Sequence, residues 1–263
     1  LQPRRAAPAP ARNVIARIAL AILFALGAAP ASAESKISLD GVWRGTLGKQ
    51  AIVACFDGDS GRYYYDKHAH GIDLGREDNG PRFAEGGEPL LDKLPTGYWT
   101  VAVEGGQLRG NWSAPVKGKA SQPIVAHRVA LAHPDAGACD SAEFNAPRMA
   151  GVRVDARDAT QQGVRVGIGK AVGTEVKRLQ LLGSDAPIAA INRELESGFR
   201  ESLTSAFDCN GIDGPGEYTE DPGIEFANAS WLVVRIDGSG YCGGPHPDSW
   251  SNFQTFDRRT GRK

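Results

Sequence analysis

The sequence has almost no net charge, because 30 Lys and Arg residues stand against 31 Asp and Glu residues. This balance argues against a general nucleic-acid binder, which needs an excess of basic residues. The 33 glycines follow no Gly-X-Y period, which excludes a collagen-like chain. Hydrophobic residues make up 41% of the chain and charged residues 23%, the proportions of a folded globular protein, so wholesale disorder is not expected.

Motifs of the common enzyme classes are also missing. The chain has no Gly-x-Ser-x-Gly elbow, no Walker loop, no His-Glu-x-x-His and no Cys-x-x-Cys pair. Gly167 and Gly169 have the wrong spacing for a dinucleotide-binding loop, and a hairpin turn is predicted there instead. We therefore expect no catalytic residue and no cofactor, while a cell-wall hydrolase remains an alternative.

The one extended apolar run lies near the N-terminus. Four arginines precede residues 18–29, which are apolar, and Ala31-Ser32-Ala33 follows them. A basic start, a short apolar centre and an Ala-x-Ala end predict a secretory signal peptide over residues 1–33. The run is about 12 residues long, too short for the ~20 that span a bilayer. We expect a periplasmic or secreted protein with no transmembrane segment after cleavage.

Both ends of the sequence suggest a piece of a longer protein. Residue 1 is Leu, not an initiator Met, and the last residues up to Lys263 lie where a hairpin is predicted. We expect the second domain to be truncated at its C-terminus.

The four cysteines all follow the predicted signal peptide. An even number of cysteines in an oxidising compartment predicts two disulfides, with three possible connectivities. Each half of the chain holds two, so the simplest pairing is Cys55–Cys139 and Cys209–Cys242. The wide spacings disfavour a metal site built from these cysteines.

Residues 34–131 are predicted to form an all-β domain. Short apolar runs are separated by Gly and Asp, and several alternate with polar residues at the period of a half-buried strand. The expected strands are 42–47, 51–56, 62–65, 98–103, 108–112 and 124–131. Such a series predicts an antiparallel β-meander, closed as a small barrel or folded as a sandwich. We expect Trp43, Trp99 and Trp112 in its core. Gly41-Val42-Trp43 resembles the Gly-x-Trp start of lipocalin- and avidin-like barrels, so a small-ligand carrier is a further alternative.

Residues 132–150 are rich in Pro, Ala and polar residues and are predicted to be a linker, while residues 151–263 are predicted to form an α+β domain. One long helix is expected after the N-cap Asp185, because an apolar stripe repeats every three or four residues. The stripe consists of Ile188, Ile191, Leu195, Phe199, Leu203 and Phe207. The helix should pack on an antiparallel sheet. The expected strands are a pair around Gly169, at 163–168 and 172–182, and the segments 231–236 and 251–256, which flank the loop 238–248.

The second domain carries two recognisable motifs: a loop that reads Tyr-Cys-Gly-Gly-Pro-His-Pro over 241–247, and Phe-Asp-Arg-Arg-Thr-Gly over 256–261. They resemble a secreted domain of unknown function whose signature is a Tyr-x-Gly-Gly-x-His-Pro loop followed by a Phe-Asp-x-x-Thr-Gly-Lys hairpin. Such domains occur in lysozyme-sensing anti-sigma factors and beside peptidoglycan deacetylase domains. The resemblance implies an envelope-facing module that binds a protein or a cell-wall glycan, or an accessory module of a deacetylase.

Two groups of residues are candidates for function. The binding candidates come from the signature loop and are Tyr241, Gly243, Gly244, His246 and Asp248. The role of His246 stays open between shaping the loop by a hydrogen bond and acting as a base or ligand. His68 and His70 are the best metal candidates, since residues at i and i+2 of a strand point to one face.

Overall fold

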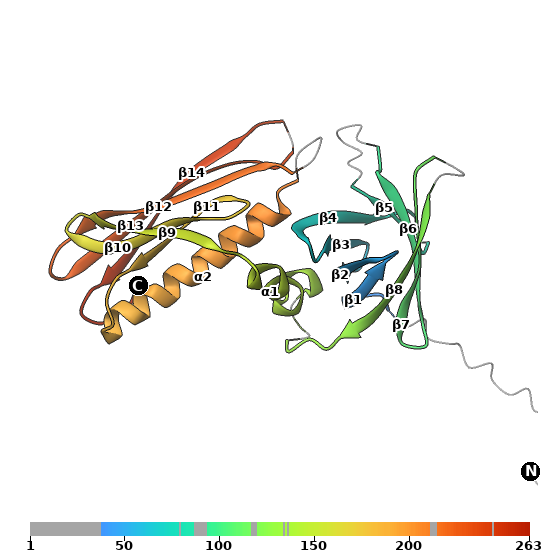
Figure 1. Ribbon diagram of the computed structural model, residues 1–263, viewed down its shortest axis with the longest axis horizontal. Helices are drawn as coiled ribbons and strands as arrows, with labels where there is room; N and C mark the ends of the chain where they lie inside the picture. The colour runs from blue at the N-terminus through green and yellow to red at the C-terminus, as the bar shows by residue number, and fades with distance from the viewer. Residues whose placement is uncertain are drawn as a thin grey trace, which may run out of the picture. The chain divides into compact units, whose positions relative to one another are not determined.

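The computed structural model describes residues 38–263, except 79, 87–93, 117–119, 134, 136, 211–214 and 244. The predicted signal peptide therefore lies outside the described residues, as does Gly244. The fold is β-rich α+β, with a closed antiparallel barrel followed by a second sheet that carries one long helix (Figure 1).

Eight strands form the barrel, each antiparallel to the next, and the last strand pairs with the first. The strands are β1 (Gly41–Leu47), β2 (Gln50–Asp57), β3 (Ser60–Tyr65), β4 (His68–Arg76), β5 (Arg82–Glu85), β6 (Gly97–Glu104), β7 (Gln107–Ser113) and β8 (Ser121–Val129). The barrel, one of the two predicted architectures, is thus confirmed, while β4 and β5 were not foreseen. Polar residues and two glycines interrupt β4, and β5 is only four residues long, so neither strand has a detectable apolar alternation.

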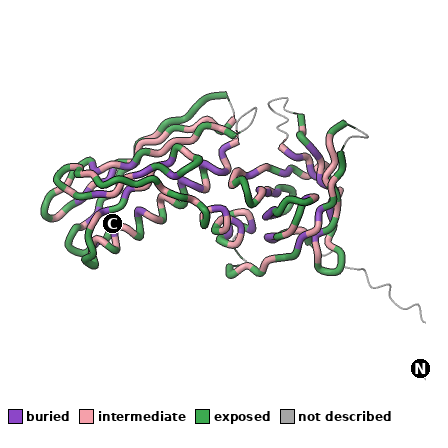
Figure 2. Tube along the Cα trace, viewed as in Figure 1, coloured by how far each residue is buried: buried purple, intermediate pink, exposed green. Residues whose placement is uncertain are grey.

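The barrel interior is filled by its own side chains. Figure 2 marks the buried residues along the barrel strands in purple. Trp43 and Trp99 are fully buried there and Trp112 is packed against them, as predicted. Two glycines allow neighbouring strands to approach closely. A Cβ on Gly45 would lie 2.0 Å from the carbonyl oxygen of Val125, and one on Gly110 equally close to a backbone oxygen of β6.

The segment predicted to be a linker, residues 132–150, contains helical structure. A short 3-10 helix, η2 (Ala138–Asp140), is followed by α1 (Ala142–Ala150). Ser141 caps α1 by accepting a hydrogen bond from the Phe144 amide at 3.3 Å. The helix was missed because Pro147 lies in its interior and cannot donate to the carbonyl four residues earlier. That carbonyl, of Glu143, instead accepts from Arg44 at 3.2 Å.

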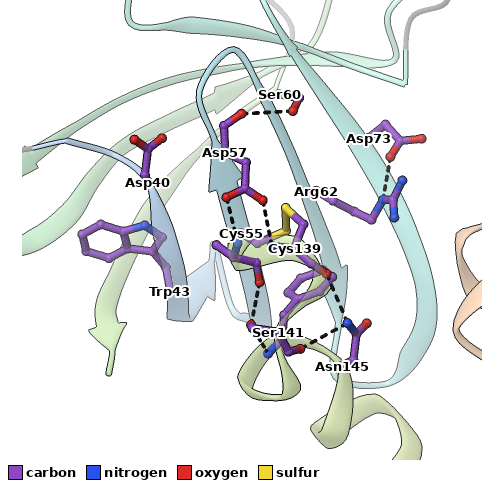
Figure 3. Close-up of a disulfide and its surroundings, with 12 residues drawn as sticks. Asp40, Trp43, Cys55, Asp57, Ser60, Arg62, Asp73, Cys139, Ser141 and Asn145 are labelled. Atoms are coloured by element: carbon purple, nitrogen blue, oxygen red, sulfur yellow. Dashed lines mark hydrogen bonds and ion pairs between the residues drawn. A yellow bond between two sulfur atoms is a disulfide. The ribbon is translucent and has the colours of Figure 1, made fainter. Parts of the chain in front are cut away.

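A disulfide joins the barrel to this segment (Figure 3). Cys55 of β2 is bonded to Cys139 of η2, which confirms the first predicted pairing. Next to it, the Asp57 carboxylate accepts hydrogen bonds from the amides of Ala138 and Cys139, at 2.8 and 2.9 Å. The start of η2 is therefore held to β2 by a covalent bond and by a carboxylate at its unpaired amides.

The second sheet has six strands in the order β14-β13-β12-β11-β10-β9. Its strands are β9 (Val154–Gln161), β10 (Val164–Ala171), β11 (Glu175–Leu181), β12 (Glu217–Ala227), β13 (Trp231–Tyr241) and β14 (Asp248–Asp257). All neighbours are antiparallel except β11 and β12, which pair in parallel over two residues on each strand. The helix α2 (Ala186–Asp208) makes the crossover between these two strands.

The long helix agrees with its prediction. Asp185 caps it by accepting from the Ile188 amide at 2.9 Å. Its apolar stripe packs on β10–β14, where Ile191 and Leu195 join the main core of the sheet. Asn192 fixes its position, because the side-chain amide of this residue accepts from the amide of Leu181 at 2.8 Å and donates to the carbonyl of Leu181 at 2.9 Å.

Three expectations for this domain need correction. Gly169 does not lie at a turn but inside β10, where it pairs with Ala156 of β9; a Cβ on it would lie only 2.4 Å from Ala156. The turn is at Gly173, where φ is +86°. β9 and β12 were not predicted, since β9 is mostly polar and β12 contains Pro222-Gly223. The loop after β13 is also shorter than expected, because β13 and β14 pair as far as Gly240 and Asp248.

An ion-paired cluster joins α1, α2 and the barrel strands. Arg148 of α1 has a fully buried side chain and donates two hydrogen bonds to the carboxylate of Asp208, at 2.6 and 3.0 Å. Its guanidinium is also 5.3 to 5.7 Å from the ring centroids of three aromatic residues, Tyr64, Phe144 and Phe207. Arg62 of β3 binds the same carboxylate at 2.6 Å. Two arginines therefore share the Asp208 carboxylate, and Arg62 has a second carboxylate partner in Asp73 at 2.7 Å.

Candidate functional site

A cleft of about 420 Å³ lies between α2 and the strands β12–β14. It lies beside the sheet core, where Leu195 of the helix meets the sheet. Its volume falls in the range of small-molecule sites, roughly 300–1,000 Å³. Its lining combines apolar and polar side chains: Leu179, Leu195, Phe199, Pro222, Ile236, Ser202, Ser205, Tyr218, Glu220, Asn252 and Gln254 among others.

Two hydroxyl groups of the cleft converge on one carboxylate. Tyr218 and Glu220 are alternate residues of β12 and so share a face of the sheet. The Tyr218 hydroxyl donates to the Glu220 carboxylate at 3.0 Å, and the hydroxyl of Ser202, from α2, donates to its other oxygen. Burial, followed by the Glu220 charge, raises the pKa of Tyr218 to about 12. The phenol therefore remains a neutral donor at physiological pH.

An aromatic pair adjoins this carboxylate. The indole of Trp250, on β14, lies against β13, where a Cβ on Gly238 would be only 2.2 Å from it. Gly240, two residues further along the same face, would place its Cβ at ordinary contact distance from the indole. The Tyr218 ring is 5.4 Å from Trp250, at an interplanar angle of 44°. Because the two glycines have no side chains, the indole packs directly on the backbone of β13, next to the cleft-lining Tyr218.

Gln254 supplies an acceptor that lacks a partner. Gln254 lies on β14, four residues after Trp250 and on the same face of the strand. Its side-chain Oε1 is buried and has no hydrogen-bond partner among the described residues. A buried carbonyl without a donor costs about 1–3 kcal/mol, which makes it an unusual group to retain unless a ligand donates to it.

The residues of the signature loop lie at the end of the sheet where Trp250 is found. Tyr241 ends β13 and is half-buried, while Gly243 has a φ of +87°, in the region that favours glycine. His246 and Asp248 are exposed, and neither lines the cleft. Next to Tyr241, Cys242 forms the disulfide with Cys209 just after α2, which confirms the second predicted pairing.

The metal prediction at His68 and His70 gains no support. In the part of the chain that the structure describes, no three His, Cys, Asp or Glu side chains are grouped so that they could hold an ion. His68 is exposed, while His70 is half-buried with its ring 6.0 Å from that of Phe207. The nearby Asp73 is occupied by Arg62 and by Asn210, at 2.7 and 2.9 Å.

The barrel interior holds a buried carboxylate among the described core residues. Glu85 accepts hydrogen bonds only from neutral groups in the described structure: the Tyr63 hydroxyl at 2.9 Å, the indoles of Trp99 and Trp112 at 3.2 and 2.8 Å, and the Thr96 hydroxyl at 2.8 Å. A barrel whose interior is filled by aromatic residues in this way gives the carrier alternative no support.

Sequence reasoning missed the cleft, although two patterns mark it. Gly198, Ser202 and Ser205 repeat at helical spacing beside the apolar stripe of α2, where small residues leave room next to the sheet. On β14, Asn252 and Gln254 share a face with the buried Phe256, so polar groups occur where core residues are expected. Each pattern points to a lined cavity only when helix and strand are known to face one another.

Comparison with known proteins adds no family. No family model matches the chain, and no curated protein matches it in sequence. In the described part of the chain, none of the helices has both the length and the apolar character needed to cross a membrane.

Proposed function

We propose that this chain is an exported, non-catalytic protein of the cell envelope that binds a ligand in the cleft between α2 and β12–β14. The observation that carries the proposal is the cleft itself. Its apolar and polar lining includes the Glu220 carboxylate, an amide oxygen that has no partner among the described residues, and Tyr218, which packs on Trp250 outside the lining. Apolar walls combined with convergent polar groups are typical of ligand-binding pockets.

Three other observations support the proposal. Two disulfides suit an oxidising compartment, and residues 1–33 have the pattern of a secretory signal. The hydroxyls of Ser202 and Tyr218 donate to the Glu220 carboxylate. Among the described residues, neither hydroxyl has a hydrogen bond to a histidine that could activate it as a nucleophile. The resemblance of the second domain to a secreted, envelope-facing family points the same way.

Retention on purified cell-wall sacculi tests this function. The folded protein should sediment with sacculi and release no soluble fragments from them. Ser205→Trp places a large ring at an exposed position that lines the cleft, so this variant should lose retention. Ser197→Trp, on an exposed part of α2 outside the cleft, is the matched control and should be retained.

The possible results separate the alternatives. Release of soluble fragments by the wild type, abolished by Ser205→Trp, would establish the hydrolase alternative instead. Equal retention of the two variants, or no retention of the wild type, would refute the cleft as the ligand site.

A further inference from the structure

We propose that the ligand of the cleft is an uncharged saccharide chain, held by donation of its hydroxyl or amide protons to Glu220 and Gln254 and by contact with the Trp250–Tyr218 pair. The inference rests on the proposed function, because it assigns a ligand class to the same cleft. It uses three properties of the walls: their hydrogen-bonding character, their aromatic surface and their charge.

The free hydrogen-bonding groups of Glu220 and Gln254 are acceptors, so a ligand must supply the donors. Glu220 already receives the hydroxyls of Ser202 and Tyr218, so these groups are committed within the protein. A carboxylate has about four lone-pair directions, and two remain for a ligand. The Gln254 Oε1 has no donor among the described residues. A ligand rich in O–H and N–H groups satisfies both acceptors.

The aromatic surface suits a sugar ring. A pyranose has hydroxyls around its rim and C–H groups on its faces, so it bonds to acceptors at its edge and packs against an aromatic ring with its face. Gly238 covers part of the Trp250 indole, and this side chain, next to the cleft-lining Tyr218, remains partly exposed. Tyr218 joins the two parts of the site, because its ring contacts Trp250 and its hydroxyl contacts Glu220.

The charges at the cleft do not select an anion. Lys177, one of two lysines in the lining, is ion-paired with Asp221 outside it. The lining also contains Glu201 in addition to Glu220, so acidic and basic residues balance. An extended peptide would bring one carbonyl acceptor for each amide donor, and these carbonyls would face the acceptors of the wall. The walls therefore favour a neutral saccharide over a peptide.

Isothermal titration of the full, disulfide-bonded chain tests the ligand class with two probes. One probe is a tetrasaccharide of β-1,4-linked N-acetylglucosamine, and the other is an unglycosylated cell-wall stem tetrapeptide. We expect saturable binding of the tetrasaccharide and no binding of the peptide. Tetrasaccharide binding should also change the tryptophan fluorescence. Trp250→Phe should abolish this change, whereas Trp231→Phe, at an exposed position on the other face of the sheet, should keep it.

A paired substitution tests the polar contact. Gln254→Leu should weaken tetrasaccharide binding at least about tenfold, since it removes a buried acceptor from the site. The midpoint of thermal unfolding should not fall, because an unpartnered buried carbonyl is lost. Gln180→Leu, at an exposed position of β11, is the matched control and should bind like the wild type.

The outcomes distinguish this inference from the proposed function. Binding of the peptide alone would overturn the saccharide assignment but leave a ligand-binding cleft. Equal affinities of Gln254→Leu and Gln180→Leu would also overturn the inference. If neither probe binds and Ser205→Trp leaves sacculus retention unchanged, the inference and the proposed function both fail.

Discussion

Removal of the Asp208 carboxylate is the most severe test of how the chain is held together. The Arg148 side chain beside it has no exposed surface and is enclosed by three aromatic rings, so its charge has no route to water. Breaking a buried pair by removing one partner typically costs 3–5 kcal/mol, because the remaining charge is left uncompensated. We therefore expect Asp208→Ala to lower the free energy of unfolding by about 3–5 kcal/mol, a large share of the ~5–15 kcal/mol that stabilises a typical domain.

The reverse substitution should cost much less. Arg148→Met keeps a flexible apolar stem among the three rings, and Asp208 retains its ion pair with Arg62 at 2.6 Å. The double variant Asp208→Ala/Arg148→Met should then be more stable than Asp208→Ala alone, since no charge remains buried without a partner. This order of stabilities separates the cost of an unpaired buried charge from the loss of packing.

Guanidinium chloride unfolding, followed by circular dichroism, measures these differences. The reasoning is refuted if Asp208→Ala costs less than about 1 kcal/mol, the value of an exposed ion pair. It is also refuted if Arg148→Met costs as much as Asp208→Ala.

Three further predictions concern other parts of the chain. The double variant Cys55→Ala/Cys139→Ala removes a disulfide between residues that are 84 apart in the sequence. By the chain-entropy model it should lose about 4–5 kcal/mol of stability, as measured by denaturant unfolding, and an unchanged midpoint would contradict this. Gly238→Ala should cost about 1–3 kcal/mol and shift the tryptophan emission, because the new methyl would overlap the Trp250 indole; unchanged emission would argue against the packing of Trp250 on Gly238. Burial, followed by a nearby guanidinium, lowers the pKa of His70, so the unfolded chain binds its proton more readily. Stability should therefore fall as the pH drops from the unfolded pKa of about 6.5 toward the folded one, and His70→Gln should flatten this slope in thermal melts taken across that range; an equal slope in the two proteins would show that His70 is not the source.

The parts of the fold that sequence predicts are those with strong local signals. The apolar stripe and the Asp185 cap predict α2 almost to the residue, and the equal division of four cysteines gives the correct pairing. Elements fail to be predicted where tertiary contacts override local preference. α1 tolerates an internal proline because Arg44 satisfies the freed carbonyl, a contact across 99 residues.

The candidate site was harder to predict than the fold, for a physical reason. Its groups come from α2, β12 and β14, three separate elements whose side chains are brought together only by tertiary packing. The histidines that attract notice in the sequence, His68 and His246, are exposed and lie outside the cleft. Gln254 and Ser202 have no distinctive sequence context, so their importance appears only from what surrounds them.

Under the proposed function, the disulfide between Cys209 and Cys242 affects when the cleft can bind its ligand. It joins the residue that follows α2 to the residue that follows β13, and these two elements form opposite walls of the cleft. A newly made chain with reduced thiols lacks this brace, so its two walls can separate during fluctuations and hold a ligand poorly. Under the proposed function, the cleft should therefore bind its ligand well only after this disulfide has formed in an oxidising compartment.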